Sequence, residues 1–111
     1  MAIKYSKYEK QPDEKILLGF NIEGDLAVGS TDIVNLGSST VTVKDDISKT
    51  DLTATMVEPG SLVLSEDNLT LHARIIGGIA GKYYWVEFRA ATTEGNLYER
   101  DVKLKIFNPA E

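Results

Sequence analysis

The chain has 111 residues, of which 42% are hydrophobic and 26% are charged, and this composition suits one globular domain with a single core. It contains no cysteine, which excludes the disulfide-bonded sandwich of antibody domains. Acidic residues outnumber basic ones 17 to 12, so we expect no nucleic-acid partner. No apolar run is long enough for a membrane span or a signal peptide, so we expect no membrane partner and synthesis in the cytoplasm.

The first fourteen residues are polar and have no hydrophobic period. Pro12 favours extended backbone before it and cannot donate a hydrogen bond to a sheet. We therefore predict an extended N-terminal arm over residues 1–14 and one domain over residues 15–108. The lysines at the start of the chain are predicted to be solvated: Lys4, Lys7, Lys10 and Lys15.

Short segments with alternating or β-branched residues follow the arm and are separated by Gly, Pro, Asn and Asp. Such segments are typical of strands and turns. The predicted strands cover residues 15–22, 31–36, 40–44, 52–57, 69–76, 83–90 and 101–107, and residues 61–64 form either a short edge strand or part of a connection. No window has a helical period longer than a turn or two. The sequence therefore predicts an all-β fold, an immunoglobulin-like β-sandwich of about seven antiparallel strands.

The last two predicted strands form a hairpin whose faces can be assigned from the two-residue alternation of strands. The inward rows are Tyr84, Val86 and Phe88 on one strand and Val102, Leu104 and Ile106 on the other. If Thr93 pairs with Leu97, Phe88 lies opposite Val102. On the outer face this register pairs Arg89 with Asp101, Glu87 with Lys103, Trp85 with Lys105, and Tyr83 with Phe107.

Residues suited to catalysis or metal binding are sparse. His72 is the single histidine and is expected on the exposed face of a strand, without a nucleophile pattern around it. We therefore expect no enzymatic activity and no cofactor. Two loops hold acidic residues that are predicted to be solvated, although oxygen ligands of this kind could also hold Ca²⁺: Asp45, Asp46, Asp51, Glu66 and Asp67.

Surface aromatic residues are the most informative feature for function. Alternation places Tyr83, Trp85 and Phe107 outside the core, and Tyr5 and Tyr8 lie in the predicted arm. Exposed Tyr and Trp often mark protein interfaces, so these five residues are candidate partner contacts. Two other interpretations remain open: the aromatic side chains cover the sheet or pack under the arm, or they form a sugar-binding strip.

The glycine-rich turn at residues 77–81, the tyrosine-rich strand at 83–90, the hairpin at 92–96 and the glutamate-led strand at 99–106 form a recognisable series. Together with the proline-acid segment at 10–18, the series resembles small virion proteins of tailed phages and prophages, of the fibre–tail adaptor type. The resemblance covers both ends of the chain. A glycine-to-tyrosine spacing before a penultimate strand also occurs in bacterial Ig-like repeats.

The resemblance implies a non-enzymatic virion structural protein that joins tail, neck or fibre components. Its partners would be other virion proteins and further copies of itself, and it would be made in the cytoplasm of a bacterial host. The alternative is a bacterial Ig-like domain for adhesion or carbohydrate binding, which the same strand pattern also permits.

Overall fold

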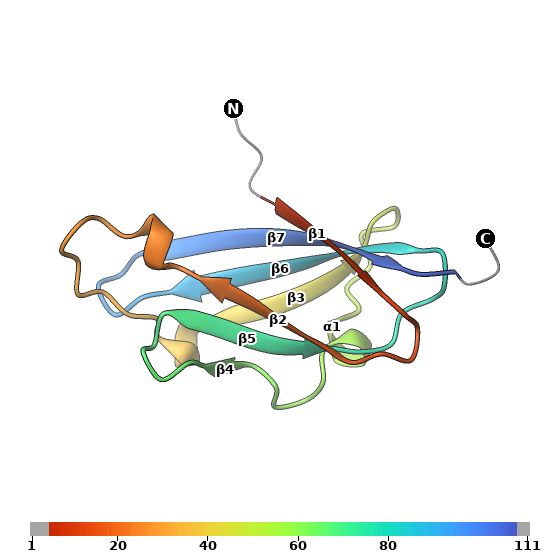
Figure 1. The fold of residues 1–111 in the computed structure, drawn as a ribbon, viewed down its shortest axis with the longest axis horizontal. Coiled ribbons are helices and arrows are strands. Elements are labelled where there is room, and N and C mark those ends of the chain that lie inside the picture. Colours follow the sequence, from red (N-terminus) through yellow and green to blue (C-terminus); the bar gives the residue numbers. More distant parts are fainter. Residues whose placement is uncertain (1–4, 109–111) are drawn as a thin grey trace.

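The computed structural model describes residues 5–108, and side chains from Lys7 onward. Two β-sheets pack face to face (Figure 1), and within the described residues one has the order β1-β7-β6-β3 and the other β2-β5-β4. The strands are β1 Tyr5–Lys10, β2 Ile16–Asn21, β3 Thr40–Asp45, β4 Val63–Leu64, β5 Thr70–Ile75, β6 Tyr83–Ala91 and β7 Leu97–Ile106. The helices are short: 3₁₀ turns η1 Glu23–Asp25 and η2 Leu36–Ser38, and α1 Thr53–Met56.

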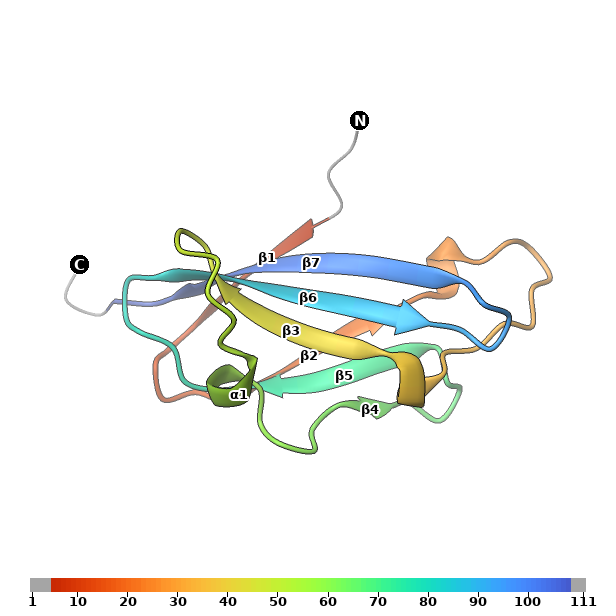
Figure 2. The same ribbon diagram turned by 180° about the vertical axis from the view of Figure 1, so that it is seen from behind.

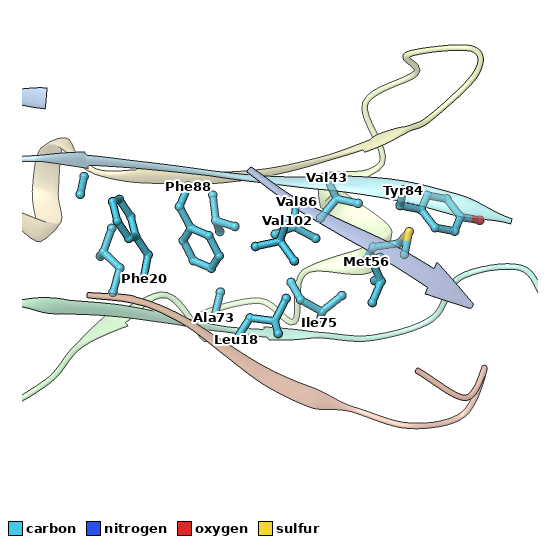
Figure 3. Close-up of a cluster of buried hydrophobic side chains, with 14 of the residues drawn as sticks. Leu18, Phe20, Val43, Met56, Ala73, Ile75, Tyr84, Val86, Phe88 and Val102 are labelled. Carbon is cyan, nitrogen blue, oxygen red and sulfur yellow. The ribbon is translucent and has the colours of Figure 1, made fainter. Parts of the chain in front are cut away.

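The core lies between the two sheets and is built from alternate residues of their strands. Figure 3 shows Phe20 and Ala73 from one sheet facing Phe88 and Val86 from the other. The rings of Phe20 and Phe88 have centroids 6.4 Å apart. Both predicted inward rows of the last hairpin are buried, as are further core residues such as Leu18, Ile22, Val41, Val43, Met56, Leu71 and Ile75. The predicted all-β sandwich is therefore confirmed.

The segment predicted as an arm contributes a strand to the sandwich. Its residues Tyr5–Lys10 are extended, as expected, and form β1, which pairs in parallel with β7 (Figure 1). The sandwich of the described chain thus begins before residue 15, and one of its strand pairings is parallel. Because the two paired segments are almost a hundred residues apart in sequence, no local pattern could reveal this pairing.

Lys10 is buried, so its predicted solvation was wrong. Its ammonium donates to the carbonyl oxygens of Gln11, Pro12 and Gly77 at 2.7, 3.0 and 2.7 Å. Desolvation lowers the pKa of Lys10, although nearby Glu14 and Asp13 act in the opposite direction. A buried charge is tolerated only when its hydrogen bonds are satisfied, and here they join the β1–β2 turn to the loop before β6.

Two predicted strands are replaced by turns. Residues 52–57 contain α1, because the Asp51 carboxylate accepts from the Thr53 N–H and the chain then closes a helical turn onto the Leu52 carbonyl. In residues 31–36 only an isolated bridge forms, between Val34 and Thr92. The side chains of Asp32 and Asn35 there accept from nearby backbone N–H groups, which bends the chain.

The β6–β7 register differs from the predicted one by two residues. Val86 pairs with Val102, and Ala91 rather than Thr93 closes against Leu97. The loop of the hairpin is longer than predicted, because Thr92 Oγ1 accepts from the Asn96 N–H and Gly95 takes a positive φ of 86°. A shift of two preserves both faces, so the buried rows stayed correct while the cross-strand partners were wrong.

Three charged side chains are affected by this register. Arg89 still contacts Asp101, at 3.5 Å, but also pairs with Glu99 at 3.0 Å. Glu87 pairs with Lys44 of β3 at 3.3 Å instead of Lys103. Arg100 now lies opposite Phe88 and places its guanidinium 4.9 Å from the centre of the Phe20 ring, where it covers one end of the core.

Gly78 permits the close approach between the loop before β6 and the end of β7. A Cβ atom there would lie 2.7 Å from Ile106 side-chain atoms and 3.2 Å from the Met56 methyl group, and φ is +96°. We predict that Gly78→Ala lowers the free energy of unfolding by at least about 1 kcal/mol more than Gly60→Ala does. Gly60 has a similar φ of +75° but open space around it. Chemical denaturation of both variants measures the difference, and equal losses would contradict the proposed packing.

Candidate protein-binding face

The outer face of the four-stranded sheet carries an open depression of about 510 Å³ where β1 pairs with β7. Its lining residues come from three strands: Lys7, Tyr8 and Glu9 of β1, Tyr83 of β6, and Lys103 and Lys105 of β7. Tyr8 is 49% exposed and Tyr83 is 41% exposed. The depression therefore combines exposed aromatic surface with ammonium groups.

The sheet geometry explains why these residues meet. In the parallel β1–β7 pairing Lys7 lies beside Lys103 and Glu9 beside Lys105. In the antiparallel β6–β7 pairing Tyr83 lies beside Lys105. Side chains at paired positions share a face, so Lys7, Glu9, Tyr83, Lys103 and Lys105 point away from the core, whereas Tyr8, which pairs with the buried Leu104, belongs to the opposite face of β1.

The lysines of β7 lie over the aromatic rings of β6. The Lys103 ammonium is 5.2 Å from the centre of the Tyr83 ring and 5.4 Å from that of Trp85, and the Lys105 ammonium is 5.9 Å from that of Tyr83. Cation–π contacts of this kind contribute about 0.5–1 kcal/mol each at exposed sites. They hold flexible lysine side chains in place and give the face a defined positive surface.

Asp46 fixes Trp85 next to the depression. The Trp85 indole N–H donates to the Asp46 carboxylate at 2.7 Å, and the Lys103 ammonium lies 3.9 Å from the same group. The Asp46 N–H in turn donates to the carbonyl of Tyr83 at 3.1 Å. Trp85 is thus half-buried, and these contacts fix its ring beside the depression.

Asp45 stabilises the turn that carries Asp46. Its carboxylate is 2.8 Å from the Lys82 ammonium and accepts from the N–H groups of Ile47 and Ser48. The hydrogen bond from Lys82, followed by those from the backbone, holds the pKa of the Asp45 carboxyl well below its ordinary value. The same contact raises the pKa of Lys82. The turn between β3 and α1 is therefore anchored directly beside the start of β6.

The structure brings together part of the predicted contact set. Tyr8 and Tyr83 line the depression and Trp85 lies beside it. Phe107 follows β7, is half-buried and donates its N–H to the Lys10 carbonyl at 2.7 Å, so it does not line the depression. Tyr5 begins β1, but its side chain lies outside the described residues.

Sequence reasoning missed the charged half of this face. Lys7 and Glu9 were assigned to an arm, and Lys103 was paired with Glu87 instead of with the aromatic rings. The outward alternation of Lys103 and Lys105 next to Tyr83 and Trp85 was the available signal. No pattern in the sequence indicated that β1 contributes to this face, because its contribution depends on a parallel pairing with a distant strand.

Of the loop acids that were predicted to be solvated, Asp45 is buried, so the prediction was wrong for this residue, whereas Asp51, Glu66 and Asp67 are exposed. Asp51 accepts from the Thr53 N–H, and Asp67 accepts from Ser65 Oγ and the Leu69 N–H. Among the described residues no group of three His, Cys, Asp or Glu side chains is placed to hold a metal ion. His72 is half-buried and its ring lies against Gly19 of the neighbouring strand. No helix in the described chain is both long enough and apolar enough to cross a bilayer.

Comparison with known proteins defines the class first. A family model described as "Podophage GP4 fiber-tail adaptor protein gp77" matches residues 10–105, which is most of the chain and includes β2 to β6 and nearly all of β7. This is a class of small structural proteins of phage tails. The chain belongs to this family of podophage fibre–tail adaptor proteins. No curated protein matches it. The resemblance seen in the sequence is therefore confirmed.

The low pKa of Asp45 makes a prediction for the pH dependence of stability. A carboxyl group whose folded pKa lies below its unfolded value stabilises the fold above the unfolded pKa, near 3.9, and loses this effect as pH falls further. We predict that Asp45→Asn is less stable than the parent chain at pH 7 and that the gap narrows below about pH 4. Denaturation at several pH values measures it, with Glu66→Gln, on the exposed β4–β5 turn, as the control. A gap independent of pH would contradict this role.

Proposed function

We propose that this chain is a non-enzymatic structural protein of the virion that joins tail, neck or fibre components by protein–protein contacts. The family match supports the adaptor role. The outer face of the four-stranded sheet, with its partly exposed Tyr83 among lysines, supports a protein contact surface there. Aromatic side chains anchored by neighbouring groups are the usual centres of binding energy in protein interfaces.

The single observation that carries this proposal is the arrangement of Tyr83. Its ring is 41% exposed on a rigid strand and lies under the ammonium groups of Lys103 and Lys105. An exposed aromatic residue on a loop could adjust on its own, whereas this one is already held in position. Preorganised contacts lose less conformational entropy on binding, which suits a component that must assemble in many identical positions.

We further propose that the fold is immunoglobulin-like and that several copies assemble in one particle. The sheet orders support the first point, because β2-β5-β4 matches the B-E-D order of one immunoglobulin sheet and β3-β6-β7 matches the C-F-G order of the other, with β1 added in parallel beside β7. The use of several copies follows from the symmetry of phage tails and rests on the adaptor role.

The alternative, an adhesion or carbohydrate-binding domain, has less support. A sugar-binding strip requires aromatic faces open to a sugar ring. The Lys103 ammonium lies within 5.2 and 5.4 Å of the Tyr83 and Trp85 ring centres and so covers the faces that a sugar would need.

Loss of the protein from its phage tests the adaptor role. We predict that inactivating the gene yields particles whose tails lack attached fibres in electron micrographs, and that the parent gene supplied in trans restores them. Tyr83→Ala supplied in trans should restore fibres poorly, whereas Leu17→Ala, a change of similar exposure on the other sheet, should restore them fully.

Both variants should first show cooperative unfolding, so that a folding defect is recognised. Normal fibres without the protein would contradict the adaptor role. Full rescue by Tyr83→Ala would leave the adaptor role standing but would contradict the assignment of the contact face.

A further inference from the structure

One end of the sandwich carries only acidic charges in its loops. The loops over residues 22–33, 65–69 and 92–96 meet at the left end in Figure 1. They contain no lysine or arginine and hold Glu23, Asp25, Asp32, Glu66, Asp67 and Glu94. The buried Asp32 accepts from the Glu94 N–H, at 3.1 Å, and from the Asn96 side chain, at 3.1 Å, which ties two of these loops together.

The loop after β2 projects furthest from this end (Figures 1 and 2). Its base is fixed by η1 and by Leu26, which packs against the core. Its tip is a turn in which the Ser30 N–H donates to the Ala27 carbonyl at 3.0 Å and Gly29 has a φ of +82°. Val28 at this tip is fully exposed, and Glu23 and Asp25 lie in the same loop. The loop thus presents an apolar tip flanked by carboxylates.

The aromatic depression lies toward the opposite end of the molecule and has the complementary chemistry. Among the described side chains that line it, Lys7, Lys103 and Lys105 are basic and Glu9 is acidic. The partly exposed Tyr83 ring supplies its aromatic surface. The chain as a whole has a net charge of −5, so a locally positive surface of this kind is set apart from the rest.

We propose that the loop over residues 23–29 of a second copy of this chain docks in the depression. Val28 of the one copy packs against Tyr83 of the other. The carboxylates of Glu23 and Asp25 then approach the lysines of the depression. This inference rests on the proposed function and names one partner of the same face.

The contact joins opposite ends of two identical chains and is therefore heterologous, so it leaves one free loop and one free depression in each pair. Such contacts propagate from copy to copy and form a ring when the rotation closes. The acidic loops at one end and the lysines of the depression also orient approaching copies head to tail, because ends of like charge repel each other. A protein used around a symmetric tail would gain its orientation from this polarity.

A nucleic acid fits the depression less well. Glu9 lies within it, and the acidic surface of the rest of the chain would repel a phosphate backbone. An isolated acidic segment of another virion protein would satisfy the lysines but would not require the exposed Val28. The experiment below separates these occupants.

Sedimentation velocity of the full chain tests the proposal. We predict concentration-dependent association at protein concentrations up to about 1 mM in about 50 mM NaCl, weakened at least about tenfold in about 500 mM NaCl. Lys7→Glu and Glu23→Lys should each weaken association at least about tenfold, because each places like charges together. An equimolar mixture of the two variants should associate again, since it restores opposite charges in one contact.

Lys15→Glu is the matched control, because it changes net charge as Lys7→Glu does but lies at the start of the other sheet. Val28→Ser should weaken association, whereas Leu17→Ser, another exposed apolar position, should not. Circular dichroism of each variant confirms folding.

A chain that stays monomeric in low salt would overturn the proposal, as would association that is insensitive to Lys7→Glu and Glu23→Lys or a mixture that fails to associate. Binding of a duplex oligonucleotide or of an acidic peptide in place of self-association would identify another occupant and overturn it as well. None of these results would contradict the adaptor role, which loss of fibres after gene inactivation tests separately.

Discussion

Parallel hydrogen bonding between β1 and β7 is the interaction on which the candidate binding face depends. Without it, Lys7, Tyr8 and Glu9 would not lie next to Lys103 and Lys105, and the depression would lose one of its walls. The pairing also covers the edge of β7, which would otherwise expose unpaired backbone groups. A strand near the start of the chain therefore completes both the sheet and the surface.

Lys10 provides the main side-chain anchor of β1. The described side chains before it in the strand, Lys7, Tyr8 and Glu9, are exposed, whereas Lys10 is buried with its ammonium bonded to carbonyl oxygens. Hydrogen bonds to a charged group contribute about 1.5–3 kcal/mol each, and desolvation of the ammonium offsets part of this. The strand is thus fixed at its C-terminal end, while its outer residues remain available to a partner.

Hydrophobic alternation was enough to predict the sandwich and the buried faces of β6 and β7, because a strand period of two determines which side chains share a face. It could not determine register, since a shift of two residues leaves the faces unchanged, and hydrogen bonds within the Thr92–Asn96 loop decided it. It also misassigned residues 52–57, where the Asp51 side chain stabilises a helical turn. The aromatic half of the candidate face was visible in the sequence as Tyr83 and Trp85, whereas the β1 half depended on a pairing across nearly the whole chain.

Nuclear Overhauser measurements on the full chain in solution test the pairing of β1 with β7 most directly. The structure predicts cross-strand contacts between Tyr8 and Leu104 and between Lys10 and Ile106, together with slow amide exchange along β1. Random-coil shifts and unprotected amides over residues 5–10, with no contact to β7, would contradict it, because the depression would then not exist in the free protein.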